Sequence, residues 1–183
     1  MQRLLTVLLF TVGLALASGV VATRSHAARD AATACNLRGS WVASHAETNR
    51  YFQALNPTTG DISIQSGALV ATFTRTQFTF GGIGLVIVGH RGSTTIKEEV
   101  DLNATAGYTV RGSTIHLGPG SYKLVHVHTT LTTAGKTKSI SLPTFSLATP
   151  GKDVPYSCTP RRLRLTVVAG RASVPLTLAR ERR

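Results

Sequence analysis

The sequence predicts an all-β fold, an antiparallel up-and-down β-barrel that follows a short N-terminal helical segment. From residue 61 onward, Thr, Val and Ile alternate with other residues at a period of two, which is the pattern of strands with one buried face. Glycine-containing turns separate these runs at regular intervals, as they do in β-sandwiches and closed barrels. No helical pattern separates the runs, which argues against a parallel sheet.

Residues 1–27 have the composition of a secretory signal peptide. Arg3 precedes an uncharged run of apolar and small residues, Leu4–Ala22, and cleavage is expected after Ala22 or after Ala27. The run is also long enough to be an uncleaved membrane anchor. We therefore expect a protein that is secreted, either extracellular or held in the cell envelope.

The rest of the chain suits one domain. We expect 28–36 to be a flexible leader and 37–183 to fold as a single barrel with a sizeable core. The chain has two cysteines, Cys35 and Cys158, and an even number of cysteines in an exported protein predicts a disulfide. Closing so long a loop stabilises a fold by roughly 4–5 kcal/mol in the chain-entropy model. The alternative is a lipid attached to Cys35.

The predicted elements begin with a short strand, Leu37–Val42, and a helix, Ser44–Leu55, whose apolar residues recur at helical spacing. Turn residues at 56–60 end the helix. The expected strands after it are Ile62–Ser66, Ala68–Thr74, Gln77–Phe80, Leu85–His90, Thr94–Thr105, Tyr108–Arg111, Thr114–Leu117, Tyr122–Thr132, Thr137–Leu147, Arg161–Val168 and Ala172–Arg180. The expected separators are Gly81-Gly82, Arg91-Gly92, Ala106-Gly107, Gly112-Ser113, Gly118-Pro119-Gly120, Ala134-Gly135 and Ala169-Gly170.

The two ends of this predicted domain carry a further signal. Gly39 and Trp41, the only Trp in the chain, lie on the first strand, and Arg180 closes the last one. This arrangement resembles the lipocalin-type barrel and the wider calycin group, and the run Tyr156–Arg180 resembles the C-terminal hairpin of small secreted bacterial members. The resemblance implies that the Arg covers the Trp ring and helps to seal one end of the barrel. Such a cation–π contact is worth roughly 0.5–2 kcal/mol.

Glu98 is the most informative charged residue of the expected lumen. Residues two apart on a strand share a face, and one face of this strand reads Ile96, Glu98, Val100 and Leu102. A carboxylate in such an apolar row must be paired, solvated inside a cavity or protonated. The alternative is a position at the rim of the barrel.

The predicted strand Tyr122–Thr132 supplies further lumen residues. Tyr122, Leu124, His126 and His128 occupy one of its faces if the strand is regular. Two histidines at this spacing could form half of a metal site, but zinc needs three or four ligands; spacing marks no third, although His90 and His116 are free candidates. We therefore expect no metal and no other cofactor. The alternative for both histidines is a hydrogen-bonded or exposed position.

The leading functional expectation is that the lumen binds a small apolar or amphipathic molecule, because ligand sites are mostly apolar with a few polar groups. The expected ligand-binding residues are Glu98, Tyr122, Leu124 and His126. A lumen filled by large core side chains would instead leave no room for a ligand.

Two other classes of function stay open. The formal net charge is +12, and a basic surface favours an anionic envelope polymer or partner. Nucleic acid is not expected, because the chain has a signal peptide, few aromatic residues and no recognition motif. The sequence lacks hydrolase, phosphate-loop and metalloprotease motifs, so an enzyme is not the leading expectation. The third hypothesis is an isomerase or cyclase that uses Glu98 or a histidine as acid or base.

Overall fold

The computed structural model describes residues 35–55, 61–142, 145–169 and 172–181. The expected signal peptide and nearly all of the expected leader lie outside these ranges. Within the described ranges, no helix has the length and apolar character needed to cross a membrane.

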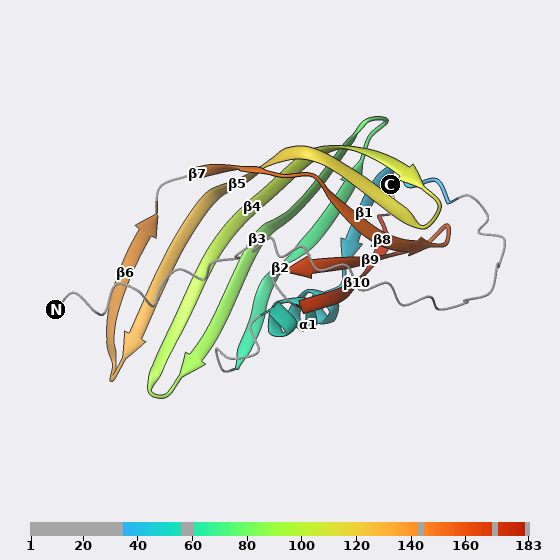
Figure 1. Cartoon of the computed structure of the whole chain (residues 1–183). Coiled ribbons are helices and arrows are strands. Elements are labelled where there is room, and N and C mark those ends of the chain that lie inside the picture. The colour runs from blue at the N-terminus through green and yellow to red at the C-terminus, as the bar shows by residue number, and fades with distance from the viewer. Residues whose placement is uncertain (1–34, 56–60, 143–144, 170–171, 182–183) are drawn as a thin grey trace.

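One helix and ten strands make up the described chain (Figure 1). They are β1 (Gly39–Ala43), α1 (His45–Leu55), β2 (Ile62–Phe73), β3 (Gln77–Arg91), β4 (Thr94–Arg111), β5 (Thr114–Thr133), β6 (Lys136–Leu142), β7 (Phe145–Thr149), β8 (Lys152–Cys158), β9 (Arg162–Ala169) and β10 (Ala172–Arg180).

The strands form a closed antiparallel barrel, as the sequence predicts. Neighbours from β1 to β5 pair in order, and β8, β9 and β10 complete the ring back to β1. Strands β6, β7 and β8 lie one after another along β5, so they act as three segments of one interrupted strand. The barrel therefore has eight strand positions. The long strands β3, β4 and β5 extend well beyond the short strands β8, β9 and β10 (Figure 1).

Several glycines predicted as turns lie inside long strands, so those predicted strand ends are wrong. Gly81 and Gly82 belong to β3, Gly107 to β4 and Gly120 to β5. The pairing register shifts just after Gly82, and a side chain at Gly81 would approach the Leu102 carbonyl oxygen within 2.6 Å. Glycine here serves bulges and close backbone approach, the other common reasons for glycine in a strand.

The region before the last hairpin also differs from the prediction. The expected strand Thr137–Leu147 is divided into β6 and β7, and β8 was not predicted at all. Cys158 is the last residue of β8. Pro150 and Gly151 separate β7 from β8, and proline cannot donate a ladder hydrogen bond. These residues disrupt the regular alternation on which the prediction depended.

Helix α1 covers one side of the barrel interior and begins one residue later than predicted. Ser44 caps it, since its hydroxyl accepts a hydrogen bond from the Glu47 backbone N–H at 3.2 Å. Its buried residues are Thr48, Tyr51 and Phe52, and the helix packs against β2 and β10. The helix therefore contributes aromatic rings to the core next to the barrel wall.

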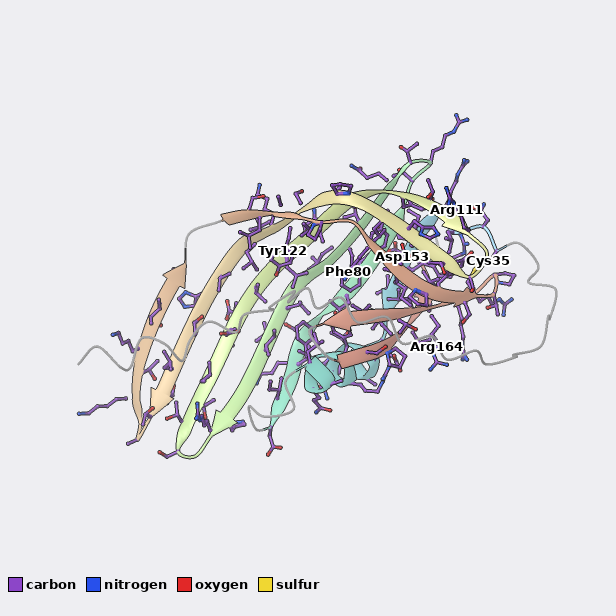
Figure 2. All side chains as sticks on the ribbon, in the orientation of Figure 1. Cys35, Phe80, Arg111, Tyr122, Asp153 and Arg164 are labelled. Atoms are coloured by element: carbon purple, nitrogen blue, oxygen red, sulfur yellow. A yellow bond between two sulfur atoms is a disulfide. The ribbon has the colours of Figure 1, made fainter. Side chains whose placement is uncertain are left out.

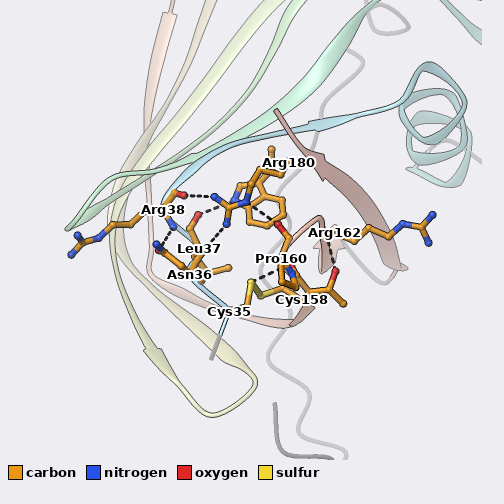
Figure 3. The surroundings of a disulfide bond; sticks show 10 residues. Cys35, Asn36, Leu37, Arg38, Cys158, Pro160, Arg162 and Arg180 are labelled. Atoms are coloured by element: carbon orange, nitrogen blue, oxygen red, sulfur yellow. Dashed lines mark hydrogen bonds between the residues drawn. A yellow bond between two sulfur atoms is a disulfide. The ribbon is translucent and has the colours of Figure 1, made fainter. Parts of the chain in front are cut away.

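One end of the barrel is sealed by the expected contact between Trp41 and Arg180, which lie near the two ends of the domain (Figure 3). Trp41 is fully buried, and the Arg180 guanidinium lies 4.3 Å from the centre of its ring. Arg180 also donates hydrogen bonds to the backbone carbonyls of Asn36, Arg38 and Pro160. The guanidinium thus ties the segment just before β1 to the turn before β9.

Two further features fix this sealed end. Gly39 has φ +116°, a conformation that favours glycine, and it brings the backbone against Arg180. Cys35 and Cys158 form the expected disulfide, with their Cα atoms 6.0 Å apart. The segment before β1 is therefore covalently joined to the end of β8.

Candidate functional site

A cavity of about 130 Å³ lies inside the barrel, between α1 and the strands. Its lining is mostly apolar and aromatic, as is usual for small-molecule sites. Figure 2 labels Phe80 of β3 and Tyr122 of β5, which line two of its walls. The lining residues are Tyr51, Phe52, Leu55, Leu69, Phe78, Phe80, Leu102, Ala104, Thr105, Ala106, Leu117, Gly118, Tyr122, Thr149, Pro150, Lys152, Val154, Leu165 and Val167.

Strand register explains why space remains here. Ala104 of β4 stands opposite Phe80 on one side and opposite Tyr122 on the other. Residues directly opposite on antiparallel strands share a face, so the two rings flank a methyl group. A small side chain between two large ones leaves a volume that a larger residue at position 104 would fill.

The aromatic residues of β2 and β3 do not fill the lumen. Phe73 and Phe78 pack with ring centres 4.8 Å apart, and Phe73 packs edge-on against Tyr108 at 5.3 Å. Phe73 and Leu85 are buried in the core, whereas Phe78 and Phe80 form part of the cavity lining. These rings therefore pack against one another in one wall, and the cavity beside them remains.

Three ionisable side chains reach the cavity lining. Burial raises the pKa of Tyr51 to about 12 and also raises the pKa of Tyr122, so both phenols are neutral at physiological pH. Burial lowers the pKa of Lys152. Of the described lining residues, Lys152 alone belongs to a charged type. Sequence reasoning missed Lys152 because β8 was not predicted, although Lys152, Val154 and Tyr156 alternate as a strand should.

Glu98 lies on the apolar face of β4, as strand parity predicted, but outside the cavity lining. It stands opposite Ile87 of β3 and the buried Thr129 of β5. Within the described residues its carboxyl group has no hydrogen bond or ion pair, and burial raises its pKa to about 7. Leu102, which lines the cavity, is four residues further along β4, or about 13 Å away along the strand.

A bulge in β5 separates the residues that were expected to share one face. Tyr122 stands opposite Ala104 and Leu124 opposite Leu102, but the register then shifts. His128 stands opposite Glu99, on the face away from Glu98, and its Nδ1 lies 3.0 Å from the Ser141 hydroxyl. The expected continuous face is therefore wrong, because one extra residue in a strand reverses its parity.

Leu124 and His126, two of the residues expected to bind the ligand, lie on either side of this bulge. The backbone of His126 pairs with Asp101, and its side chain lies outside the described part of the structure. Leu124 faces the same side as Leu102 but is not part of the cavity lining. Tyr122 lines the cavity, and the ligand-binding roles of Glu98, Tyr122, Leu124 and His126 all stay predictions.

A further histidine is paired with a carboxylate on the barrel wall. His116 Nδ1 of β5 lies 2.6 Å from a carboxylate oxygen of Asp153 of β8, and both side chains are partly exposed. Among the described residues, no three His, Cys, Asp or Glu side chains are grouped closely enough to hold a metal ion. The contact between His116 and Asp153 joins the neighbouring strands β5 and β8.

Comparison of the chain with known protein families, with curated proteins and with solved structures finds no match.

Proposed function

We propose that this protein is an exported lipocalin-like barrel that binds a small apolar or amphipathic molecule in its lumen. The apolar cavity of about 130 Å³ carries the proposal. The covering of Trp41 by Arg180, which resembles the sealed end of lipocalin-type barrels, supports it. In such a protein the sealed end holds the barrel together while the cavity receives the ligand.

The size of the cavity limits the ligand. An engineered apolar cavity of about 150 Å³ stays dry and takes up benzene, and the cavity here is similar in size. A small ring or part of one alkyl chain therefore fits. Each buried methylene group contributes about 0.8 kcal/mol, so short chains bind weakly and longer ones more tightly.

Filling the cavity tests the proposal. Ala104→Phe places a ring between Phe80 and Tyr122, whereas Ala148→Phe adds the same ring at an exposed position on β7. NMR titration with toluene should move the amide signals of lining residues in the parent protein and in Ala148→Phe. In Ala104→Phe the apparent affinity should fall about tenfold or more, given the loss of the space. Equal binding by both variants, or no response at the lining residues of the parent protein, would reject the cavity as the site.

A second candidate function follows from the surface. Arg161, Arg162 and Arg164 are exposed at the start of β9, and Figure 2 shows Arg164 on the outside of the barrel. Neighbouring exposed arginines attract anionic polymers through long-range electrostatics. An envelope polymer could be held there whether or not the lumen is occupied.

A further inference from the structure

Lys152 occupies a particular place in the cavity wall. It stands opposite Leu117 of β5 at the first position of β8. In the described structure, β8 pairs with β9 only through its last three residues, 156–158. Lys152, at the other end of β8, is therefore not paired with β9. The side chain is partly buried and lies among the apolar residues of the lining.

In the described part of the chain, the ammonium group of Lys152 has no partner of opposite charge. Within the described residues it makes no hydrogen bond or ion pair, and the adjacent Asp153 is engaged with His116. A charged group in apolar surroundings is costly unless it is paired or hydrogen-bonded. Burial lowers the pKa of Lys152, which reflects this cost. An anion bound beside it would remove the cost.

The other residues of the cavity lining indicate that such an anion should also have an apolar part. Leu117 stands opposite Lys152, and Val154, Val167 and the rings of Phe80 and Tyr122 line the same cavity. These surfaces gain by contact with an apolar chain or ring. One positive group at the edge of an otherwise apolar cavity is complementary to an amphipathic molecule with one negative end.

We propose that Lys152 selects the ligand: the cavity takes amphipathic monoanions, with the carboxylate of a short or medium-length aliphatic acid at Lys152 and the adjoining part of its alkyl chain among the apolar lining residues. This inference rests on the proposed ligand-binding function and specifies the chemical class of the ligand. The alternative is that the Lys152 side chain extends its ammonium group into solvent and only its methylene groups contact the cavity.

Three probes with the same alkyl chain separate these outcomes: octanoate, 1-octanol and octylammonium, each titrated at pH 7 by calorimetry. The variants are Lys152→Met, which keeps the length of the side chain without the charge, and Lys152→Arg, which keeps the charge. Lys123→Met is the matched control, because Lys123 is an exposed lysine on β5 next to Tyr122.

The parent protein should bind octanoate about tenfold or more tightly than 1-octanol, which is the size of effect that a charge-assisted hydrogen bond gives. It should bind octylammonium least tightly. Lys152→Met should lose the preference for octanoate and keep the affinity for 1-octanol. Lys152→Arg and Lys123→Met should keep the preference.

Each contrary result has its own meaning. If 1-octanol binds as tightly as octanoate, or if Lys152→Met keeps the preference, the role of Lys152 is wrong while the proposed binding function stands. If none of the three probes binds to the parent protein, the ligand class is wrong. The toluene titration of the Ala104→Phe pair then decides separately whether the cavity binds apolar molecules at all.

Discussion

Replacing Glu98 by Gln should make the protein more stable at neutral and alkaline pH and leave its stability in acid unchanged. Burial raises the pKa of Glu98 from 4.5 to about 7, so the folded protein holds this proton more tightly than the unfolded chain does. The stabilisation by the protonated carboxyl is complete below about pH 4.5 and is lost as the pH rises through 7. Glutamine has a similar shape and no proton to lose, so it avoids the penalty.

The size of the effect follows from the same pKa. One pKa unit corresponds to about 1.36 kcal/mol, so the rise from 4.5 to about 7 gives at most about 3 kcal/mol well above pH 7. Glu98 is partly exposed, and water screens part of this cost. We therefore expect the free energy of unfolding of Glu98→Gln to exceed that of the parent protein by about 2–3 kcal/mol in alkali.

Urea unfolding followed by far-ultraviolet circular dichroism measures this difference from about pH 4 to about pH 9. The matched control is Glu99→Gln, because Glu99 is the next residue and forms an exposed ion pair with Lys97 on the other face of β4. Loss of that pair should cost only about 0–1 kcal/mol. A difference between Glu98→Gln and the parent protein that stays constant with pH, or shrinks as the pH rises, would refute the reasoning.

Two other predictions concern arginines. Arg180→Met removes the cation over Trp41 and three hydrogen bonds to carbonyls, so unfolding should become about 2–4 kcal/mol easier in urea, whereas the exposed neighbour Arg161→Met should change stability by less than about 0.5 kcal/mol. Equal effects of the two changes would contradict the sealing role of Arg180. Replacing all three of Arg161, Arg162 and Arg164 by Ser should lower the salt concentration needed for elution from immobilised dextran sulfate. The reason is that exposed arginines attract the sulfate groups through electrostatic interactions that salt screens. Unchanged elution would exclude these arginines as the polymer site.

The sealed end of the barrel could be predicted because particular residue types mark it in the sequence. Trp41, Gly39 and Arg180 are distinctive residues at fixed places near the chain ends, and two cysteines leave one intramolecular pairing. The barrel class was equally accessible, because alternation and glycine content persist along the whole domain. These features do not depend on the exact register of any strand pair.

The candidate site depended on register and could be predicted only in part. Glu98 was placed on the apolar face because β4 is regular between Thr94 and Asp101, whereas β5 contains a bulge before His126 that no residue type announces. Any residue can occupy a bulge, and a single insertion moves every later side chain to the opposite face. Lys152 was missed for a different reason, since the prolines around β8 conceal a strand that pairs with only part of each neighbour.

The barrel closes through β8, but β6 and β7, the other two segments of the interrupted strand, form an open sheet edge. Among the described strands, β6 and β7 pair with β5 alone, so their other sides present unpaired backbone groups. Such an edge can recruit a strand from another molecule and begin aggregation, and charged side chains oppose this. Strand β6 carries Lys136 and Lys138, both exposed. We therefore expect these two lysines to hinder neighbouring copies from joining edge to edge, a task separate from any ligand or polymer.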